Sequence, residues 1–414
     1  LEWRAILQLG AAVFCIFAAY MPAANLASSL EKQIGYYANA ATYTFSVIGA
    51  PLAVVIVRRS GARVSFAVGS LPYAFFVLAN WALNAGVMSW PVYVFAASLN
   101  GLGGALLWTG LGVYTNDAAR SWSATLGAAP TAHLGRFNAI PWALQFVASA
   151  LSQLACGFLL PKFSAQIVFL ALTFVALAGF VIALGLPLVA PPTNDVRSSN
   201  DAPSRGIYTL LRSNPVSRWF IPVFLAHGFN QGFMFGTLPA TATDWLSGSV
   251  AAAAMVMAFN SVADCAAAMG LGRLSDTVGF KYTLLSTATC DAVAALLLVV
   301  FADADFGSQI SWLTLLVLAG LFACADAGWQ TQGSAGIGCL LPNDEGPAFS
   351  LMVILKGVGT ATSFFLGPLL SLRTKALVLL GSIIFGMVAA AALPSGTSAR
   401  CSMLHDDVPE PLNT

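Results

Sequence analysis

The sequence predicts an all-α integral membrane protein whose twelve spanning helices form two halves of six. Only 8% of the 414 residues are charged, whereas a soluble domain carries about 25%. The mean hydropathy is +0.80. Continuous apolar runs such as 5–23 and 168–189 reach the length of about 20 residues that a helix needs to cross a bilayer. These runs favour helices over the short alternating strands of a membrane barrel.

Breaks at glycine, proline and charged clusters place the helices and divide them six and six. The polar stretch Pro191–Pro215 is the longest connection, and its composition predicts a flexible cytoplasmic linker. The predicted domains are a first bundle at 1–190, the linker at 191–215, a second bundle at 216–394 and a cytoplasmic tail at 395–414. The predicted helices are 4–26, 34–57, 64–85, 91–117, 136–160, 165–190, 217–240, 248–272, 281–302, 309–338, 347–370 and 375–394.

The basic residues predict that both termini lie in the cytoplasm. In that orientation thirteen Lys and Arg residues fall on the cytoplasmic side and four fall outside, with Lys356 inside the membrane. The plasma membrane and an internal membrane both fit this pattern. The chain begins at Leu1, and we expect a short N-terminal piece to precede it. The first apolar run is too long for a removable signal peptide and lacks its small-residue cleavage site.

A repeated loop indicates that the two halves are related. The stretch Gly272–Lys281 (GRLSDTVGFK) joins the predicted eighth and ninth helices and matches the G-x-L-x-D-x-x-G-x-K/R loop signature of major facilitators. Gly61 and Arg63 occupy the equivalent turn 218 residues earlier. Proteins of that superfamily repeat six helices in parallel and bind substrate between the halves. The resemblance implies a cytoplasmic latch formed by Gly272, Arg273, Asp276, Gly279 and Lys281.

Two stretches of the second half carry a more specific resemblance. Asp326–Gln332 reads D-A-x-x-x-T-Q, and Pro342–Phe349 reads P-x-D-x-x-P-A-F. In the first half, Gly101–Tyr114 is rich in glycine, and Gly135–Asn138 is followed by Gln145. These stretches resemble the tenth, eleventh, fourth and fifth helices of the uncoordinated-ninety-three-like proteins, a family within the major facilitators that is described as ion-channel regulators. The resemblance implies a role in potassium homeostasis or membrane-protein regulation, with an ion channel or receptor as partner.

Four charged residues of the second half fall near the predicted membrane midplane. Asp264, Asp291, Asp326 and Lys356 lie about 12, 15, 18 and 14 Å from the cytoplasmic ends of their helices, and the first half has no such charge. Each isolated charge would cost about 2.5–3.5 kcal/mol, so we expect pairing. Lys356 with Asp326 is the predicted pair, and Asp264 is the competing partner. The pair is either a structural lock, a substrate or proton site, or a contact for gating or a partner.

The glycines of 101–112 allow two interpretations. Their small-residue spacing is typical of close helix packing, and it also fits a deformable helix that lines a cavity with Trp108 and Thr109. At position 356 the resemblance implies a polar amide, so Lys356 departs from the family pattern. The candidate central-cavity residues are Asp264, Asp326, Lys356, Gln330, Trp108 and Thr109.

The remaining motifs weigh against enzymatic activity. The sequence has no phosphate-binding loop, nucleophile elbow or dinucleotide fingerprint, and His133, His227 and His405 are scattered. Its seven cysteines lack metal-ligand spacing and are interpreted as small buried apolar residues. We therefore expect no cofactor, no metal and no nucleic-acid partner, and the lipid bilayer is the predicted environment. Two functions remain: a membrane regulator, or a secondary transporter that moves a small solute or ion by alternating access, with proton coupling through Asp326 or Asp264.

Overall fold

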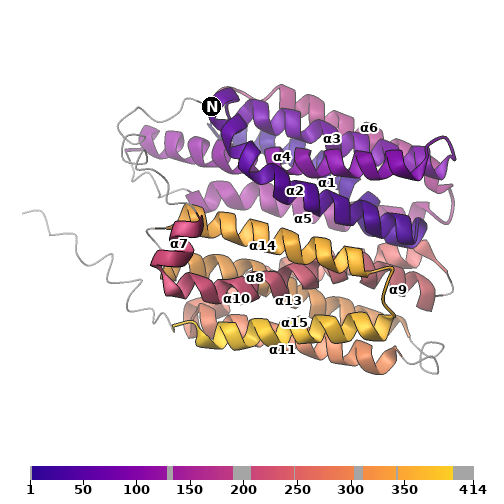
Figure 1. Ribbon diagram of the computed structural model, residues 1–414. Coiled ribbons are helices and arrows are strands. Elements are labelled where there is room, and N and C mark those ends of the chain that lie inside the picture. The colour runs from indigo at the N-terminus through magenta and orange to yellow at the C-terminus, as the bar shows by residue number, and fades with distance from the viewer. Residues whose placement is uncertain are drawn as a thin grey trace, which may run out of the picture.

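The computed structural model describes residues 2–127, 134–189, 207–246, 248–302, 311–341 and 344–394, and these residues form helices joined by short turns. Figure 1 shows two bundles with roughly parallel helices, the first in indigo to magenta and the second in rose to yellow. The first bundle contains α1 (Glu2–Leu30), α2 (Gln33–Ser60), α3 (Ala62–Asn84), α4 (Trp90–Thr125), α5 (Leu134–Leu159) and α6 (Ala165–Leu184).

The second bundle follows the same plan with one interrupted helix. It contains α7 (Ile207–Ser213), α8 (Pro215–Gly232), the π-helical turn η1 (Phe233–Thr237), α9 (Leu238–Trp245), α10 (Val250–Val278), α11 (Phe280–Phe301), α13 (Trp312–Leu340), α14 (Glu345–Leu366) and α15 (Leu372–Ala392). Among the described residues, 11 single helices are long and apolar enough to cross a membrane. The twelfth crossing is composite, because η1 splits it into α8 and α9. The predicted twelve-helix architecture is confirmed.

The structure differs from the predicted flexible linker at the end of that segment. Residues 207–213 form the helix α7, and Leu210 is fully buried. The Asn214 side chain then caps α8 by accepting a hydrogen bond from the Val216 amide at 3.1 Å. The overall polarity of 191–215 conceals this short apolar turn. Residues 190–206 and the predicted tail at 395–414 lie outside the described residues.

A matching turn relates the two bundles. Gly61 joins α2 to α3 with φ 84° and ψ 156°, and Gly279 joins α10 to α11 with φ 87° and ψ 156°. Positive φ favours glycine because it has no Cβ. The equivalent residues of the two halves therefore adopt the same backbone conformation, which supports the predicted internal repeat.

The basic residue two positions after each of these glycines binds the end of the last helix in its own half. Arg63 Nη2 donates to the Leu184 carbonyl at 2.9 Å, at the end of α6. Lys281 Nζ donates to the Leu393 carbonyl at 2.7 Å, just after α15. Unpaired carbonyls at a helix C-terminus attract cations. The loop signature thus serves to tie helices together within each bundle.

Glycines of α4 allow close packing in the first bundle. A Cβ at Gly101 would overlap the Thr42 carbonyl oxygen of α2, and one at Gly110 would lie 2.7 Å from the Phe66 amide of α3. A Cβ at Gly112 would meet no atom within 4 Å. The close-packing interpretation therefore holds for Gly101 and Gly110.

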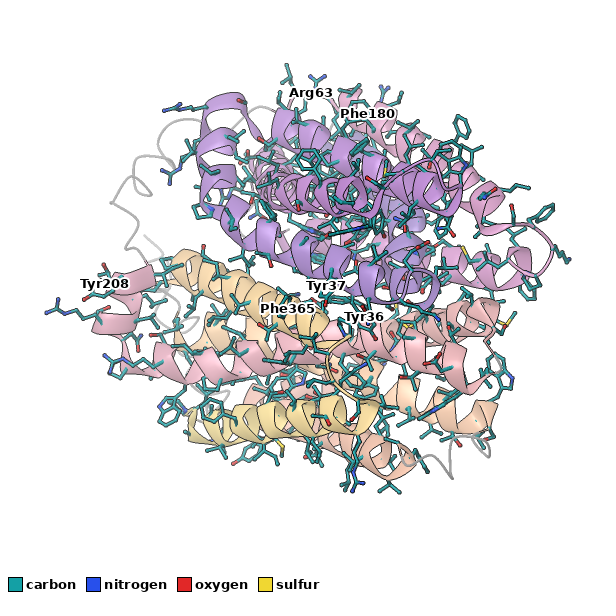
Figure 2. All side chains as sticks on the ribbon, turned by 45° about the vertical axis from the view of Figure 1, so that its right-hand side comes forward. Tyr36, Tyr37, Arg63, Phe180, Tyr208 and Phe365 are labelled. Carbon is teal, nitrogen blue, oxygen red and sulfur yellow. The ribbon has the colours of Figure 1, made fainter. Side chains whose placement is uncertain are left out.

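The two bundles meet mainly along two helix pairs, α2 with α14 and α5 with α10, and α1 also contacts η1, α9 and α10. Figure 1 shows the orange α14 beside the indigo α2. We call the end of the molecule that holds Glu2 and Ser60 the amino-terminal face, and the end that holds Leu30 and Leu366 the far face. Figure 2 shows Tyr36, Tyr37 and Phe365 gathered between the bundles.

Candidate functional site

A buried contact between α8 and α13 holds the carboxylate of Asp326. His227 Nε2 lies 3.1 Å from Asp326 Oδ1, with the His227 side chain fully buried and the Asp326 side chain 11% exposed. The sequence analysis treated His227 as an isolated histidine. The two residues are 99 positions apart, and only the rotation of α8 about its axis brings the imidazole to Asp326.

Lys356 makes a different contact from the predicted one. Its ammonium donates to Gln330 Oε1 at 2.9 Å, one helical turn along α13 from Asp326. Among the described residues no ion pair within 4 Å joins Lys356 to Asp326. The carboxylates of Asp326 and Asp264 still act on the Lys356 ammonium electrostatically. The predicted direct pair of Lys356 with Asp326 was therefore wrong, because the ammonium bonds Gln330 instead.

Asp291 is held by a tryptophan of the neighbouring helix. Trp329 Nε1 donates to Asp291 Oδ2 at 2.8 Å, and both side chains are fully buried. A hydrogen bond of this kind offsets part of the cost of burying the acid. Asp291 therefore joins α11 to α13 inside the second bundle through Oδ2, while its Oδ1 has no hydrogen-bond partner among the described residues.

Asp264 of α10 is the exception among the buried acids. It is only 6% exposed, and it has neither a hydrogen bond nor an ion pair to any described residue. Asp326 and Lys356 act on its carboxyl group electrostatically. The second half therefore presents one buried carboxyl group without a direct partner, beside a pair of opposite charges.

The first half contributes aromatic rings where the second half contributes charges. Trp108 of α4 stacks on Trp142 of α5 with ring centroids 5.0 Å apart and also packs against Phe17 of α1 at 5.1 Å. Tyr20 and Tyr73 form an edge contact at 4.7 Å beside them. The predicted cavity residue Trp108 belongs to this aromatic wall, which we define as Phe17, Tyr20, Tyr73, Trp108 and Trp142.

Thr109 plays a local role. Its hydroxyl donates to the Ala105 carbonyl of its own helix at 2.8 Å. Such a bond satisfies the hydroxyl within α4. The structure therefore brings Trp108, but not the Thr109 hydroxyl, into contact with other helices of the site.

Polar side chains join α5 and α10 in the middle of the seam between the halves. Ser149 Oγ lies 2.9 Å from Ser261 Oγ. Gln153 Nε2 donates to Ser261 Oγ at 3.2 Å, and Asn25 Nδ2 of α1 donates to Gln153 Oε1 at 3.1 Å. These contacts were missed by the sequence analysis because small hydroxyl residues inside apolar runs give little pattern to follow.

Near the far face, one carbonyl group of the second half accepts two hydrogen bonds from the first half. Ser28 Oγ donates to the Gly236 carbonyl at 2.7 Å, and the Tyr36 hydroxyl donates to the same oxygen at 3.1 Å. Gly236 lies in the π-helical turn η1. Such turns leave carbonyl groups available to other donors, so the interruption of the seventh crossing provides the acceptor that joins the halves.

The predicted cytoplasmic latch is described in part. Gly272 and Arg273 lie within α10, which extends to Val278, and Lys281 binds the end of α15 as described above. The side chain of Asp276 lies outside the described residues. An Arg273–Asp276 latch therefore stays a prediction. No cluster of three metal-binding side chains occurs within the described ranges.

Comparisons with known proteins agree with this architecture. A family model described as ion channel regulatory protein UNC-93 matches residues 27–391. UNC93-like protein 3 of Arabidopsis thaliana is 23% identical over 386 residues, which cover 88% of this chain and 80% of that relative. Protein unc-93 homolog A of Bos taurus is 23% identical over 432 residues, which cover 94% of this chain and 92% of that relative.

Solved structures of transporters share the fold. The nucleoside transporter NupG superposes with a TM-score of 0.69 at 14% identity over 94% of this chain and 98% of that one. A D-xylose-proton symporter gives a TM-score of 0.69 at 14% identity over 95% and 98%. At these identities the likeness shows the fold alone, and it confirms the predicted major facilitator fold.

Proposed function

We propose that this chain, which belongs to the UNC-93 family of ion channel regulatory proteins, is a non-enzymatic membrane protein that regulates ion balance through a partner channel or receptor. The observation that carries the proposal is the pairing inside the second half. Asp326 contacts His227, and Lys356 contacts Gln330. Both contacts give charged groups of the second half a partner inside that half, which a regulator tolerates, whereas a carrier uses such groups to bind its solute.

Potassium is the ion we propose, because the family resemblance points to it. The test is the current through a potassium channel expressed alone, with this chain, or with an unrelated major facilitator protein at equal surface density. The proposal expects this chain to change the current, the unrelated protein to leave it unchanged, and this chain alone to produce none. Equal currents in all channel-containing membranes, across a panel of potassium channels, would contradict it.

We also propose that the amino-terminal face is cytoplasmic, so that both termini lie inside. The support is the excess of basic residues on that face. Single cysteines at Ser60, on the amino-terminal face, and at Val87, between α3 and α4, test the orientation because both positions are exposed. A membrane-impermeant thiol reagent added outside should label Ser60→Cys only after permeabilisation and Val87→Cys at once. The reverse pattern would invert the assignment.

A second candidate function is secondary transport of a small solute. Asp264 favours it, because a buried carboxyl group without a partner is a typical place for a proton or a solute to bind. The two functions differ in one measurable respect. A transporter moves solute in the absence of any channel, and its uptake should fail when Asp264 or Asp326 becomes an amide.

A further inference from the structure

The register of the two antiparallel helices α5 and α10 places Gln145 and Asp264 at facing positions between the halves. Along this seam Gln153 contacts the Met257 carbonyl, and Ser149 contacts Ser261. Residue numbers thus fall along α5 as they rise along α10, so the helices are antiparallel here. One further turn toward the amino-terminal face reaches Gln145 on α5 and Asp264 on α10, since residues three or four positions apart share a helix face.

Both of these side chains present oxygen atoms that lack donors. Gln145 Oε1 is buried without a hydrogen-bond partner among the described residues, and the carboxyl group of Asp264, a residue 6% exposed, has no hydrogen bond to a described residue. Burying such acceptors unpaired is unfavourable. The Gln145 amide N–H can donate to the Asp264 carboxyl group, but Gln145 Oε1 then still lacks a hydrogen-bond donor.

The formal charges around this point indicate that the missing group is positive. Asp264 and Asp326 contribute two carboxylates, and Lys356 contributes one ammonium that acts on both. His227, which contacts Asp326, is counted as neutral. If both acids are ionised, one negative charge is left over in a buried region, and either a proton or a bound cation neutralises it.

The ring of Trp142 lies one helical turn from Gln145 on the same side of α5. Trp142 precedes Gln145 by three residues, its ring stacks on Trp108 with 12° between the planes, and 38% of the residue is exposed. Indole faces attract cations and accommodate apolar groups. An inorganic ion would use only the oxygens, whereas an organic cation would use the oxygens and the ring.

We propose that Asp264, Gln145 and Trp142 form a binding site for a small organic monocation, a protonated amine attached to an apolar or aromatic group. The ammonium donates to the Asp264 carboxylate and to Gln145 Oε1, and the apolar part lies against Trp142. The site goes beyond the regulatory function proposed above. It concerns the purified chain alone, so its failure and the failure of channel regulation are separate results.

Calorimetric titration of the full chain in nanodiscs tests the proposal, with phenethylammonium as probe and 2-phenylethanol as its neutral counterpart. We expect the amine to bind at least about tenfold more tightly than the alcohol, and Asp264→Asn to weaken it by about tenfold or more. Gln145→Leu should weaken it less. Asp291→Asn is the matched control, because that buried acid lies on α11 and accepts a hydrogen bond from Trp329 through Oδ2, and it should leave the affinity unchanged.

A second measurement needs no variant and covers the case in which Asp264→Asn does not fold. A hydrophobic carbodiimide modifies carboxyl groups inside membranes, and mass spectrometry reports the extent at each acid. Phenethylammonium should protect Asp264 and leave Asp291 unaffected. Equal affinity for amine and alcohol, equal protection of both acids, or displacement of the amine by potassium at matched concentration would each overturn the proposal.

Discussion

Replacing His227 with leucine is expected to destabilise the chain by about 1.5–3 kcal/mol, because the change removes the hydrogen-bond donor to the Asp326 carboxylate. The His227 side chain is fully buried, the Asp326 side chain is 11% exposed, and the Nε2–Oδ1 distance is 3.1 Å. Leucine and histidine have similar volumes, so the loss of stability should come mainly from the lost hydrogen bond and not from a cavity. Replacing both residues with leucine should cost less than the single change, since no unpaired acid remains.

The assay is the free energy of unfolding in mixed detergent micelles, measured as a double-mutant cycle over His227 and Asp326. We expect a coupling energy above about 1 kcal/mol. His227→Gln is the matched variant, because its amide N–H can still donate to Asp326, and it should recover part of the loss. A parallel cycle between Lys356 and Asp326 should show weaker coupling, because the ammonium bonds Gln330 directly. Additive losses for His227 and Asp326 would refute the reasoning.

Three further outcomes follow from the packing and the seam. Gly101→Ala should lower stability by more than about 1 kcal/mol, because the new Cβ overlaps the Thr42 carbonyl. Gly112→Ala, on the same helix with open space, should be neutral or stabilising by up to about 1 kcal/mol, and equal losses at both sites would contradict the packing. Ser28→Ala combined with Tyr36→Phe removes both donors to Gly236. In that double variant, a cysteine placed between the bundles near the far face should react more readily with a thiol reagent. Unchanged labelling would contradict the role of these two hydrogen bonds in joining the halves.

Composition and run length predicted the architecture because lipid imposes a minimum length on every crossing. The helices were found for that reason, even where their ends moved by several residues. The interruption at Phe233–Thr237 was not predictable, because its residues FMFGT are as apolar as an ordinary span. Only the contacts of the Gly236 carbonyl reveal its role.

Helix length predicted a similar level for the charged residues, but it could not predict their partners. Asp326, Lys356 and Asp264 were placed near one level from helix length alone, and they do act on one another. Direct partners depend on how each helix is rotated about its axis, and an almost uniformly apolar helix gives little pattern from which to read that rotation. His227 was overlooked for this reason, since a histidine on a distant helix is linked to Asp326 only through the fold.

The aromatic wall and the contacts between α5 and α10 could not be predicted from the sequence for a related reason. Trp142 has apolar neighbours on both sides in the sequence, so nothing marks its face before α4 is placed against it. Ser149 and Ser261 are 112 residues apart, and their contact depends on the antiparallel arrangement of two helices from different halves. Pseudo-symmetry predicts which helices meet between the halves. Which residues of the two helices lie opposite each other must come from the structure.

Solute uptake into liposomes that contain only the purified chain tests the central claim most directly. The panel should cover sugars, amino acids, nucleosides, inorganic ions and organic cations, each with and without an inward proton gradient. If the chain is a regulator that acts through a partner, these liposomes should take up no more solute than protein-free liposomes, apart from the cation bound at the proposed site. Gradient-driven accumulation of one solute, abolished by Asp326→Asn and retained by Gly112→Ala, would contradict the account and identify the chain as a transporter.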